Sequence, residues 1–183
     1  QNVTVKDLMY AVIVSGSKEA ELALAIYSSG SEDAFVDSMN NKAKELKMKN
    51  TYFANATGDF NNNQYCSAED YAILTKEAMH NDDIKEISIK KGYKIETEEG
   101  KSISIKNAKE LIDDAGKSKK NGYSIFGGIA SENSKDGKYT YMVSGVNGDM
   151  KLVAIAIGVA KEEMSKDAES LLTYGFKKKD RSS

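Results

Sequence analysis

Apolar residues in the first half of the chain recur at the spacing of an amphipathic helix. Residues 4–15, 17–30, 31–46 and 67–80 each place apolar side chains three and four positions apart, so that they share one face. Each of these segments begins with a serine or threonine that can cap a helix N-terminus, namely Thr4, Ser17, Ser31 and Ser67. The pattern therefore predicts a cluster of helices, the first of which begins with a capping box formed by Thr4 and Asp7.

The hydrophobic pattern changes after residue 90. Residues 93–107 predict two short alternating strands joined by a Glu-Glu-Gly-Lys turn, and residues 108–116 predict a short helix that ends at Gly116. Three longer strands are predicted at residues 123–131, 139–146 and 150–159. The last two are joined through Asn147-Gly148, a dipeptide typical of tight β-hairpins.

The final strand and the final helix indicate where the second half of the chain has its core. Residues 150–159 are apolar without alternation, which predicts a central strand covered on both faces. The helix after it carries its apolar residues on one side, at Met164, Ala168, Leu171, Leu172 and Phe176. The predicted fold class is therefore α+β: a helical cluster, a small hairpin, and an antiparallel sheet backed by a C-terminal helix.

The length of 183 residues suffices for one domain with its own core. We expect a single domain over residues 1–183, with a helical part at about 4–90 and a sheet part at about 118–176. No apolar run approaches the roughly 20 residues that cross a bilayer, so no membrane span is expected. No secretion signal is visible, which indicates a mature or trimmed product or a cytoplasmic one.

Charge and composition exclude several kinds of site. Lys and Arg number 26 against 28 Asp and Glu, so no basic face is implied and nucleic acid is not an expected partner. Cys66 and His80 are the only residues of their types, which leaves no basis for a disulfide, a cysteine-based metal cluster or a multi-histidine metal site. We expect neither a metal nor a cofactor.

Several strings of residues together resemble the D-alanyl-D-alanine carboxypeptidases, the low-molecular-weight penicillin-binding proteins. They are "VTVKDLMYAVIV", "SGSEDAFVDSMNNKAKELKMKNTYFAN", "YCSAEDYAILTKEAM" and "DMKLVAIAIG…DAESLLTYGF". The resemblance implies a penicillin-binding or β-lactamase-like fold and a place outside the cytoplasm, in the bacterial cell envelope or secreted. It also implies serine-type chemistry on peptidoglycan stem peptides, based on three motifs.

The first family motif, Ser-x-x-Lys, supplies the nucleophile and a lysine that can activate it. In the family it lies a few dozen residues before the "TVKDL" helix, and this sequence begins directly before that helix. We therefore expect the nucleophile segment, together with the strands that precede it, to be missing. No other Ser-x-x-Lys in the sequence fits the pattern.

The second family motif, Ser-x-Asn, lies on a loop between two helices and assists proton transfer. Without gaps the motif falls on Gly16, Ser17 and Lys18, so glycine replaces the serine and lysine replaces the asparagine. A shift by one residue recovers a serine at Ser15 but still no asparagine, and it needs compensating gaps. The loop is therefore expected to persist without its chemistry, with Ser17 serving only to cap the next helix.

The third family motif, Lys-Thr-Gly on an edge strand, binds the terminal carboxylate of the substrate beside an oxyanion hole. Here the resemblance gives Lys120, Asn121 and Gly122 as substrate-binding candidates, with asparagine in place of threonine. It implies that Lys120 faces the same cleft as Gly16–Lys18. The simpler interpretation is a solvated lysine that discourages pairing at a sheet edge, and we favour it because the partner motifs are lost.

Three hypotheses for the function follow. The first is a catalytically inactive domain, a pseudoenzyme kept as a binding or structural module of the cell envelope. The alternative is a fragment of a serine-type D-Ala-D-Ala carboxypeptidase whose nucleophile segment is on a removed or separate piece. The third, an engineered variant of the scaffold, would explain the absence of proline.

The expected partners follow from the same resemblance. They are a peptidoglycan stem peptide, an envelope protein, and either a second copy of the chain or a separate N-terminal piece. One of the last two is needed to cover the free edge of strand 150–159, because a bare apolar edge is prone to aggregation.

Overall fold

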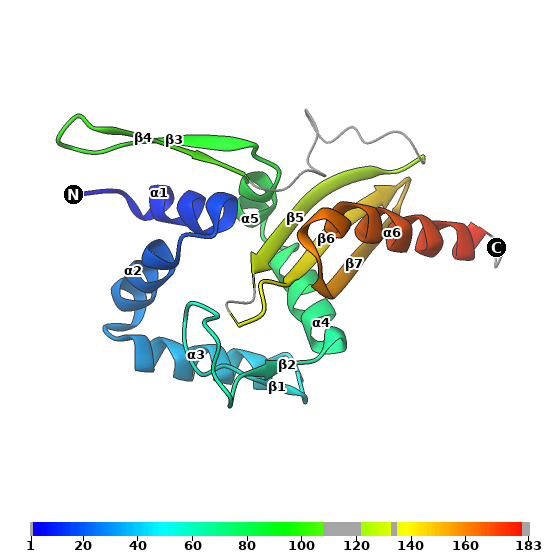
Figure 1. Cartoon of the computed structure of the whole chain (residues 1–183), viewed down its shortest axis with the longest axis horizontal. Helices are drawn as coiled ribbons and strands as arrows, with labels where there is room; N and C mark the ends of the chain where they lie inside the picture. The colour runs from blue at the N-terminus through cyan, green and yellow to red at the C-terminus, as the bar shows by residue number, and fades with distance from the viewer. Residues whose placement is uncertain (1, 108–121, 133–134, 181–183) are drawn as a thin grey trace.

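The computed structural model describes residues 2–107, 122–132 and 135–180 (Figure 1). Helices make up most of its first half, as the hydrophobic pattern predicts. They are α1 (Val5–Tyr10), which continues into a π-helical turn (Ala11–Ser15), α2 (Lys18–Ser29), α3 (Glu32–Glu45), α4 (Ala68–Ala78) and α5 (Asp82–Ser88).

The four predicted helix starts are confirmed by their caps. The side chain of Thr4 accepts a hydrogen bond from the Asp7 N–H at 3.1 Å, and the Asp7 carboxylate accepts one from the Thr4 N–H at 3.1 Å, which completes the capping box. Serines cap α2, α3 and α4, and each accepts a bond from the N–H group three residues on; they are Ser17, Ser31 and Ser67. Such a cap stabilises a helix by about 1 kcal/mol.

The π-helical turn at the end of α1 was not predicted. Its first two carbonyls accept hydrogen bonds from the loop, because the Gly16 N–H donates to the Val12 carbonyl and the Ser17 N–H donates to the Ala11 carbonyl. The Ser15 hydroxyl also donates to the Ala11 carbonyl at 2.7 Å. A single widened turn of this kind is often found at functional sites, and here it sets the direction in which the chain enters α2.

The structure also contains two very short strands that the hydrophobic pattern did not predict. β1 (Thr51–Tyr52) pairs antiparallel with β2 (Tyr65–Cys66). Two residues cannot show an alternating pattern, which explains why the prediction missed them. The buried carboxylate of Asp70 holds this pair against α4, since it accepts hydrogen bonds from the Asn50 N–H at 2.6 Å and from the Thr51 hydroxyl at 2.8 Å.

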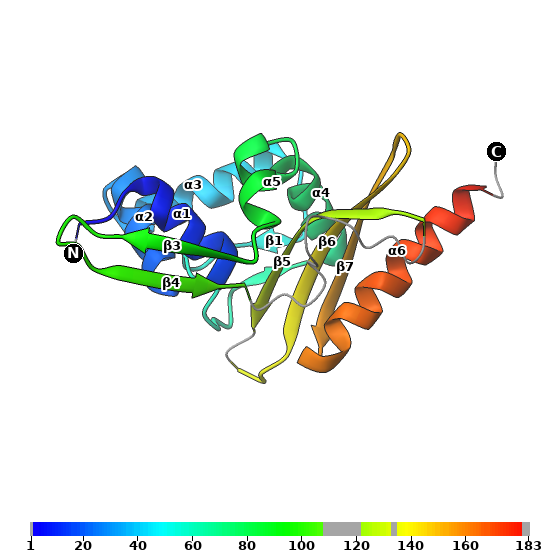
Figure 2. The ribbon, with the colours of Figure 1, turned by 90° about the horizontal axis from the view of Figure 1, so that it is seen from above.

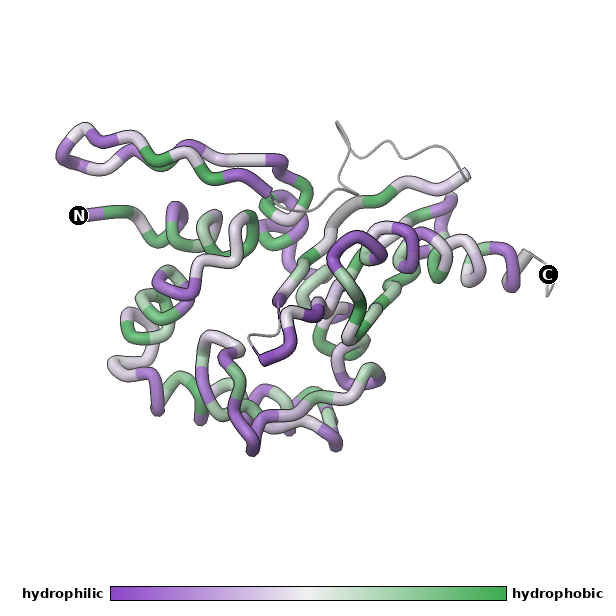
Figure 3. The backbone as a smooth tube through the Cα atoms, in the orientation of Figure 1, coloured by the Kyte–Doolittle hydropathy of each residue, from purple (hydrophilic) through white to green (hydrophobic). Residues whose placement is uncertain are grey.

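The predicted hairpin of residues 93–107 is confirmed as β3 (Gly92–Glu96) and β4 (Ser102–Lys106), which pair antiparallel. The hairpin lies along α1 (Figure 1), and the rings of Tyr10 and Tyr93 stack with centroids 3.8 Å apart. The Tyr93 hydroxyl donates to the Asp7 carboxylate at 3.1 Å. Hydrophilic residues gather at the tip of the hairpin and at the C-terminal end of the last helix (Figure 3).

The main sheet holds the three predicted long strands in the antiparallel order β5 (Ser124–Glu132), β6 (Tyr139–Asn147) and β7 (Met150–Val159). A short 3₁₀ turn (Lys161–Glu163) leads into α6 (Met164–Asp180), which covers one face of the sheet, while α4 contacts β7 from the other side (Figure 2). These elements confirm the α+β class. The predicted short helix at residues 108–116 lies outside the described residues.

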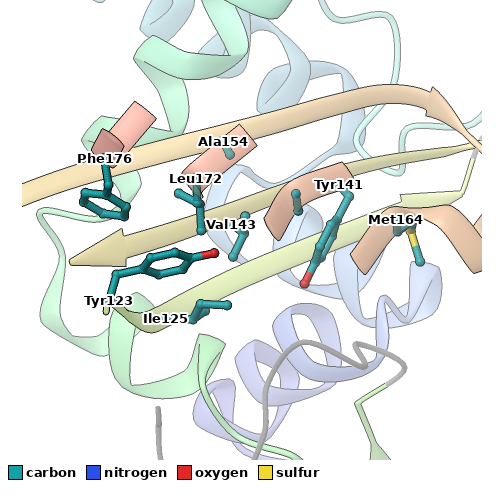
Figure 4. Close-up of a cluster of buried hydrophobic side chains, with 9 residues drawn as sticks. Tyr123, Ile125, Tyr141, Val143, Ala154, Met164, Leu172 and Phe176 are labelled. Atoms are coloured by element: carbon teal, nitrogen blue, oxygen red, sulfur yellow. The ribbon is translucent and has the colours of Figure 1, made fainter. Parts of the chain in front are cut away.

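The core under α6 contains most of the residues that the pattern indicated (Figure 4). Met164, Ala168, Leu172 and Phe176 are buried, and the Phe176 ring stacks on Tyr123 with centroids 5.0 Å apart. The prediction for Leu171 is wrong, because its side chain is 44% exposed. The buried residues recur every four positions, and Leu171 lies beside that stripe rather than on it.

The expectation that residues 150–159 form a central strand is also not met within the described residues. There β7 pairs with β6 alone, so its other edge is unpaired. The even-numbered residues Leu152 and Ala154 face α6, whereas Ile157 is 47% exposed. The strand therefore has the composition of a central strand and the position of an edge strand.

Candidate functional site

The loop between α1 and α2 carries the second predicted motif. Gly16 has φ +66°, a left-handed conformation that glycine adopts without strain, and nothing lies within 4 Å of where its Cβ would be. Gly16 therefore ends the π-helical turn. The Ser17 hydroxyl accepts a hydrogen bond from the Ala20 N–H at 3.3 Å and donates one to the Glu19 carboxylate at 3.0 Å. Ser17 thus acts as the helix cap that the sequence predicts.

Lys18 directs its ammonium group to the loop that follows β1. It donates a hydrogen bond to the carboxylate of Asp59, whose other oxygen accepts one from the Thr57 hydroxyl at 2.9 Å. The bond with Asp59 raises the pKa of Lys18, and the bond with Lys18 lowers the pKa of Asp59. Both side chains are about half exposed. Lys18, which the resemblance aligns with the asparagine of the second motif, therefore joins α2 to the facing loop.

The third predicted motif is described only at its last residue. Gly122 is exposed, has φ +81° and lies just before β5. Lys120 and Asn121 lie outside the described residues, and so does the expected approach of Lys120 to the loop at Gly16–Lys18. The position of Gly122 at the start of β5, an outer strand of the described sheet, is the part of this motif that the structure gives.

A cavity of about 340 Å³ lies where the helices meet the end of the sheet. The loop between β1 and β2 forms one wall, and α2, α3 and α4 form others. The three long strands contribute Ser131, Thr140 and Ile157, which are neighbours across the sheet. The lining is mixed, with apolar side chains beside hydroxyl, amide and carboxyl groups, as is common in ligand sites.

Glu21 contributes a carboxyl group to the lining of this cavity, and the sequence pattern did not point to it. It lies on α2, one turn after Ser17, within the run "AELALAI". Burial raises the pKa of Glu21 to about 7; Lys18 opposes the shift, whereas Asp59 and Glu19 add to it. A carboxyl group with this pKa can release or take up a proton near neutral pH. In the sequence Glu21 is one glutamate in a run of alanines and leucines. A glutamate in such a run can equally lie on the exposed face of a helix, so the pattern does not indicate that it is buried.

Two polar atoms of the cavity lack hydrogen-bond partners within the described part of the chain. They are Oε2 of Glu21 and Oδ1 of Asn55, and both are fully buried. The rest of the Asn55 side chain is held in place, since its Nδ2 donates to the Asp59 carbonyl at 2.8 Å. Buried acceptors normally have a donor, and these two lack one among the described residues.

The described residues show neither a metal site nor a membrane helix. Across residues 2–107, 122–132 and 135–180, no three His, Cys, Asp or Glu side chains are grouped so that they could hold a metal ion. Within the same residues no helix combines the length and the apolar composition that a membrane span requires.

Comparison with known proteins identifies one family, which the sequence model and the individual relatives share. The sequence model described as D-alanyl-D-alanine carboxypeptidase matches residues 1–161. D-alanyl-D-alanine carboxypeptidase DacF of Bacillus subtilis is 29% identical over 177 residues, which are 96% of this chain and 43% of that protein. D-alanyl-D-alanine carboxypeptidase DacA of Escherichia coli is 31% identical over 177 residues, which are 96% of this chain and 41% of that protein. The chain thus spans less than half the length of these relatives.

Solved structures agree with the sequence comparison. Penicillin binding protein 5 from Haemophilus influenzae superposes with a TM-score of 0.82 and 27% identity over 96% of this chain and 48% of that one. Penicillin binding protein 6B from Escherichia coli gives a TM-score of 0.76 and 27% identity over 92% and 50% of the two chains. The fold is therefore that of the penicillin-binding, β-lactamase-like peptidases.

Proposed function

The chain belongs to the D-alanyl-D-alanine carboxypeptidase family, and we propose that it forms the helical and sheet part of a serine-type carboxypeptidase domain. In this proposal the nucleophile comes from a segment outside the present sequence. The substrate class is the peptidoglycan stem peptide, and the location is the bacterial cell envelope. In this proposal the domain is complete only when the N-terminal segment and the 183-residue chain are together.

The unpaired edge of β7 is the observation that carries this proposal. β7 is apolar enough for the interior of a sheet, yet within the described chain it pairs with β6 alone. An apolar strand edge left open is a template for pairing with further strands. The relatives have more than half of their length outside the matched region, so they contain chain that could supply such strands.

The occupant of that edge is expected to be the N-terminal piece rather than a second copy of the chain. Ile157 supports this choice, because it lies on β7, is 47% exposed and also lines the cavity beside Glu21. A piece that pairs with β7 therefore passes next to the cavity. A second copy would cover the edge without bringing a nucleophile there.

A second candidate function is favoured by the loop at Gly16–Lys18. If the longer protein kept the family's chemistry, this loop would be expected to carry serine and asparagine. Instead Gly16 serves a left-handed turn, and Lys18 is joined to Asp59. These contacts support a catalytically inactive envelope module that binds a stem peptide or an envelope protein without cleaving it.

Release of D-alanine separates the two candidates. The product of the complete reading frame and the 183-residue chain are each incubated with a pentapeptide that ends in D-Ala-D-Ala, and free D-alanine is measured. The carboxypeptidase proposal predicts release by the longer product and none by the chain alone. A folded longer product that releases no D-alanine would favour the inactive module.

A further inference from the structure

Exposed lysines gather where α3 ends, on the side of the helical part that lies away from the β3–β4 hairpin (Figure 1). The whole chain has a net charge of −2, yet residues 42–49 hold four lysines and one glutamate, a net charge of +3. The glutamate, Glu45, pairs with Lys42 at 3.5 Å. Lys44, Lys47 and Lys49 are exposed, and none of them forms an ion pair with a described residue. These three lysines make a local positive surface.

Lys47 adopts a backbone conformation that lysine rarely takes. Its φ is +60°, and no other residue except glycine has a positive φ among those that the structure describes. It follows Leu46, the C-cap of α3, at a position where glycine is favoured because it takes this conformation without strain. The helix dipole accounts for Lys42 and Lys44 in the last turn, but Lys47 lies beyond the helix. The strain therefore points to a role for this lysine beyond the local fold.

The chain that carries these lysines is held in place. Met48, between Lys47 and Lys49, is buried. The next residue after Lys49 is also fixed, since the Asn50 N–H donates to the buried carboxylate of Asp70 at 2.6 Å. A partner that binds the two exposed lysines therefore does not have to order the backbone between them, which lowers the entropic cost of binding.

Two stacked tyrosines continue this surface on the β1–β2 pair. Tyr52 and Tyr65 are direct partners across the ladder, their ring centroids are 6.4 Å apart, and they are 44% and 57% exposed. Tyr52 comes three residues after Lys49, so their Cα atoms are at most about 11 Å apart. Asn50 and Asn63, each two positions before one of the tyrosines, are exposed as well. Tyr65 also lines the cavity, whereas the three lysines are not among its lining residues. The surface thus combines aromatic faces, amide groups and positive charge.

These three kinds of group select the chemistry of a partner. The face of a tyrosine ring is flat and apolar, and it packs against the C–H face of a sugar ring. Amides donate to and accept from hydroxyl groups, and ammonium groups attract anions. An acidic polypeptide would leave the tyrosine pair without a matching ring. Nucleic acid calls for a larger excess of positive charge than a chain of net charge −2 offers.

We propose that the surface formed by Lys44, Lys47, Lys49, Tyr52 and Tyr65 binds an anionic polysaccharide. Sugar rings of the polymer stack on the tyrosine pair, and its anionic groups lie beside the three ammonium groups. The residues are spread over an exposed face, so the affinity comes from several weak contacts made at once along one polymer. The surface uses none of the three family motifs, and its binding does not depend on the proposed carboxypeptidase activity.

Calorimetric titration of the 183-residue chain compares polymers that separate rings from charge. Carboxymethyl dextran carries both sugar rings and charge, dextran carries the rings alone, and poly-L-glutamate carries the charge alone. Oligodeoxythymidine tests nucleic acid. We expect carboxymethyl dextran to bind at low salt and each of the other three to bind at least tenfold more weakly. The proposal is overturned if carboxymethyl dextran does not bind, or if any of the other three binds equally well.

Two variants assign the surface, and the first separates binding from folding. Lys47→Gly relieves the strain at φ +60°, so its Tm should rise by about 2–4 °C, while its affinity for carboxymethyl dextran should fall at least threefold. Tyr52→Ser should lower that affinity at least tenfold, and Tyr65→Ser replaces it if circular dichroism shows that it is unfolded. Lys6→Gln and Tyr27→Ser, at exposed positions on α1 and α2, should change the affinity by less than twofold. The proposal is overturned if either folded surface variant keeps the wild-type affinity, or if the two controls weaken binding as much.

Discussion

Lys18, in the first turn of α2, bonds through its ammonium group to the carboxylate of Asp59 in the loop between β1 and β2. The two residues are 41 positions apart in the chain, and both side chains are about half exposed. The contact joins the two segments at the edge of the cavity that contains Glu21. Exposed ion pairs contribute little to folding stability, so the pair positions the loop more than it stabilises the fold.

Lys18→Asn, which places the family's asparagine at this position, should therefore be tolerated. We expect its Tm to differ from that of the wild type by no more than about 3 °C, because the lost pair is screened by solvent. Asp59→Asn should behave in the same way. Thermal unfolding followed by circular dichroism at low and high salt measures both, and a loss of more than about 8 °C in either variant would show that the pair holds the helical part together.

The stability of the chain should depend on the protonation of Glu21. Its pKa is raised by burial from the ordinary 4.5 to about 7. A raised folded-state pKa stabilises the fold below pH 4.5, and this contribution is lost as the pH rises through about 7. Glu21→Gln does not titrate, so we expect its Tm to rise relative to wild type between pH 4.5 and pH 8.

Glu19→Gln provides a matched control with the opposite sign. The pKa of Glu19 is lowered, first by a hydrogen bond to its own backbone and then by the Ser17 hydroxyl. Its carboxylate therefore stabilises the fold above the ordinary pKa of 4.5, and this contribution is lost only as the pH falls below that value. Between pH 4.5 and pH 8 the Tm of Glu19→Gln should therefore lie below that of wild type by a constant amount. If the Tm difference between Glu21→Gln and wild type is equally independent of pH, the assigned environment of Glu21 is wrong.

Asp70 should be among the most sensitive positions of the helical part. Its buried carboxylate accepts bonds from the Asn50 N–H and the Thr51 hydroxyl, which hold β1 against α4. Asp70→Ala should lower the free energy of unfolding by about 3 kcal/mol, because it leaves these donors unpaired. Asp37→Ala, on the exposed side of α3, should change it by no more than about 0.5 kcal/mol. Urea unfolding compares the two, and equal effects would contradict the anchoring role of Asp70.

The free edge of β7 should make the isolated chain associate. An apolar strand with an unpaired edge tends to pair with other strands, so we expect light scattering to show species larger than the 20.0 kDa monomer, and an exposed-apolar dye to bind. A charged residue in place of Ile157, Ile157→Lys, should reduce both signals. A monodisperse wild-type monomer that binds no dye would mean that the edge needs no cover.

Local signals in the sequence predicted much of this fold. The caps at Thr4, Ser17, Ser31 and Ser67 are short-range contacts, and a residue and its partner lie three positions apart, so the sequence alone shows them. The strands at residues 139–146 and 150–159 were predicted for the same reason, since an apolar run and the turn at Asn147-Gly148 are local signals.

The features that were missed depend on contacts between distant segments. The β1–β2 pair needs Asp70, and the π-helical turn gives no signature in a periodic apolar run. The environment of Glu21 arises where α2 meets the β1–β2 loop and the sheet. Neither the burial of this carboxyl group nor the contact of Lys18 with Asp59 could be derived from spacing along the chain.

Covalent labelling by a penicillin tests the central claim most directly. The 183-residue chain is incubated with a fluorescent penicillin, denatured, and examined by gel fluorescence and intact mass, beside the product of the complete reading frame. If the chain is the helical and sheet part of a domain whose nucleophile is elsewhere, it stays unlabelled and the longer product gains one adduct on a serine outside residues 1–183. A stoichiometric, denaturation-resistant adduct on any serine of the 183-residue chain would contradict the account.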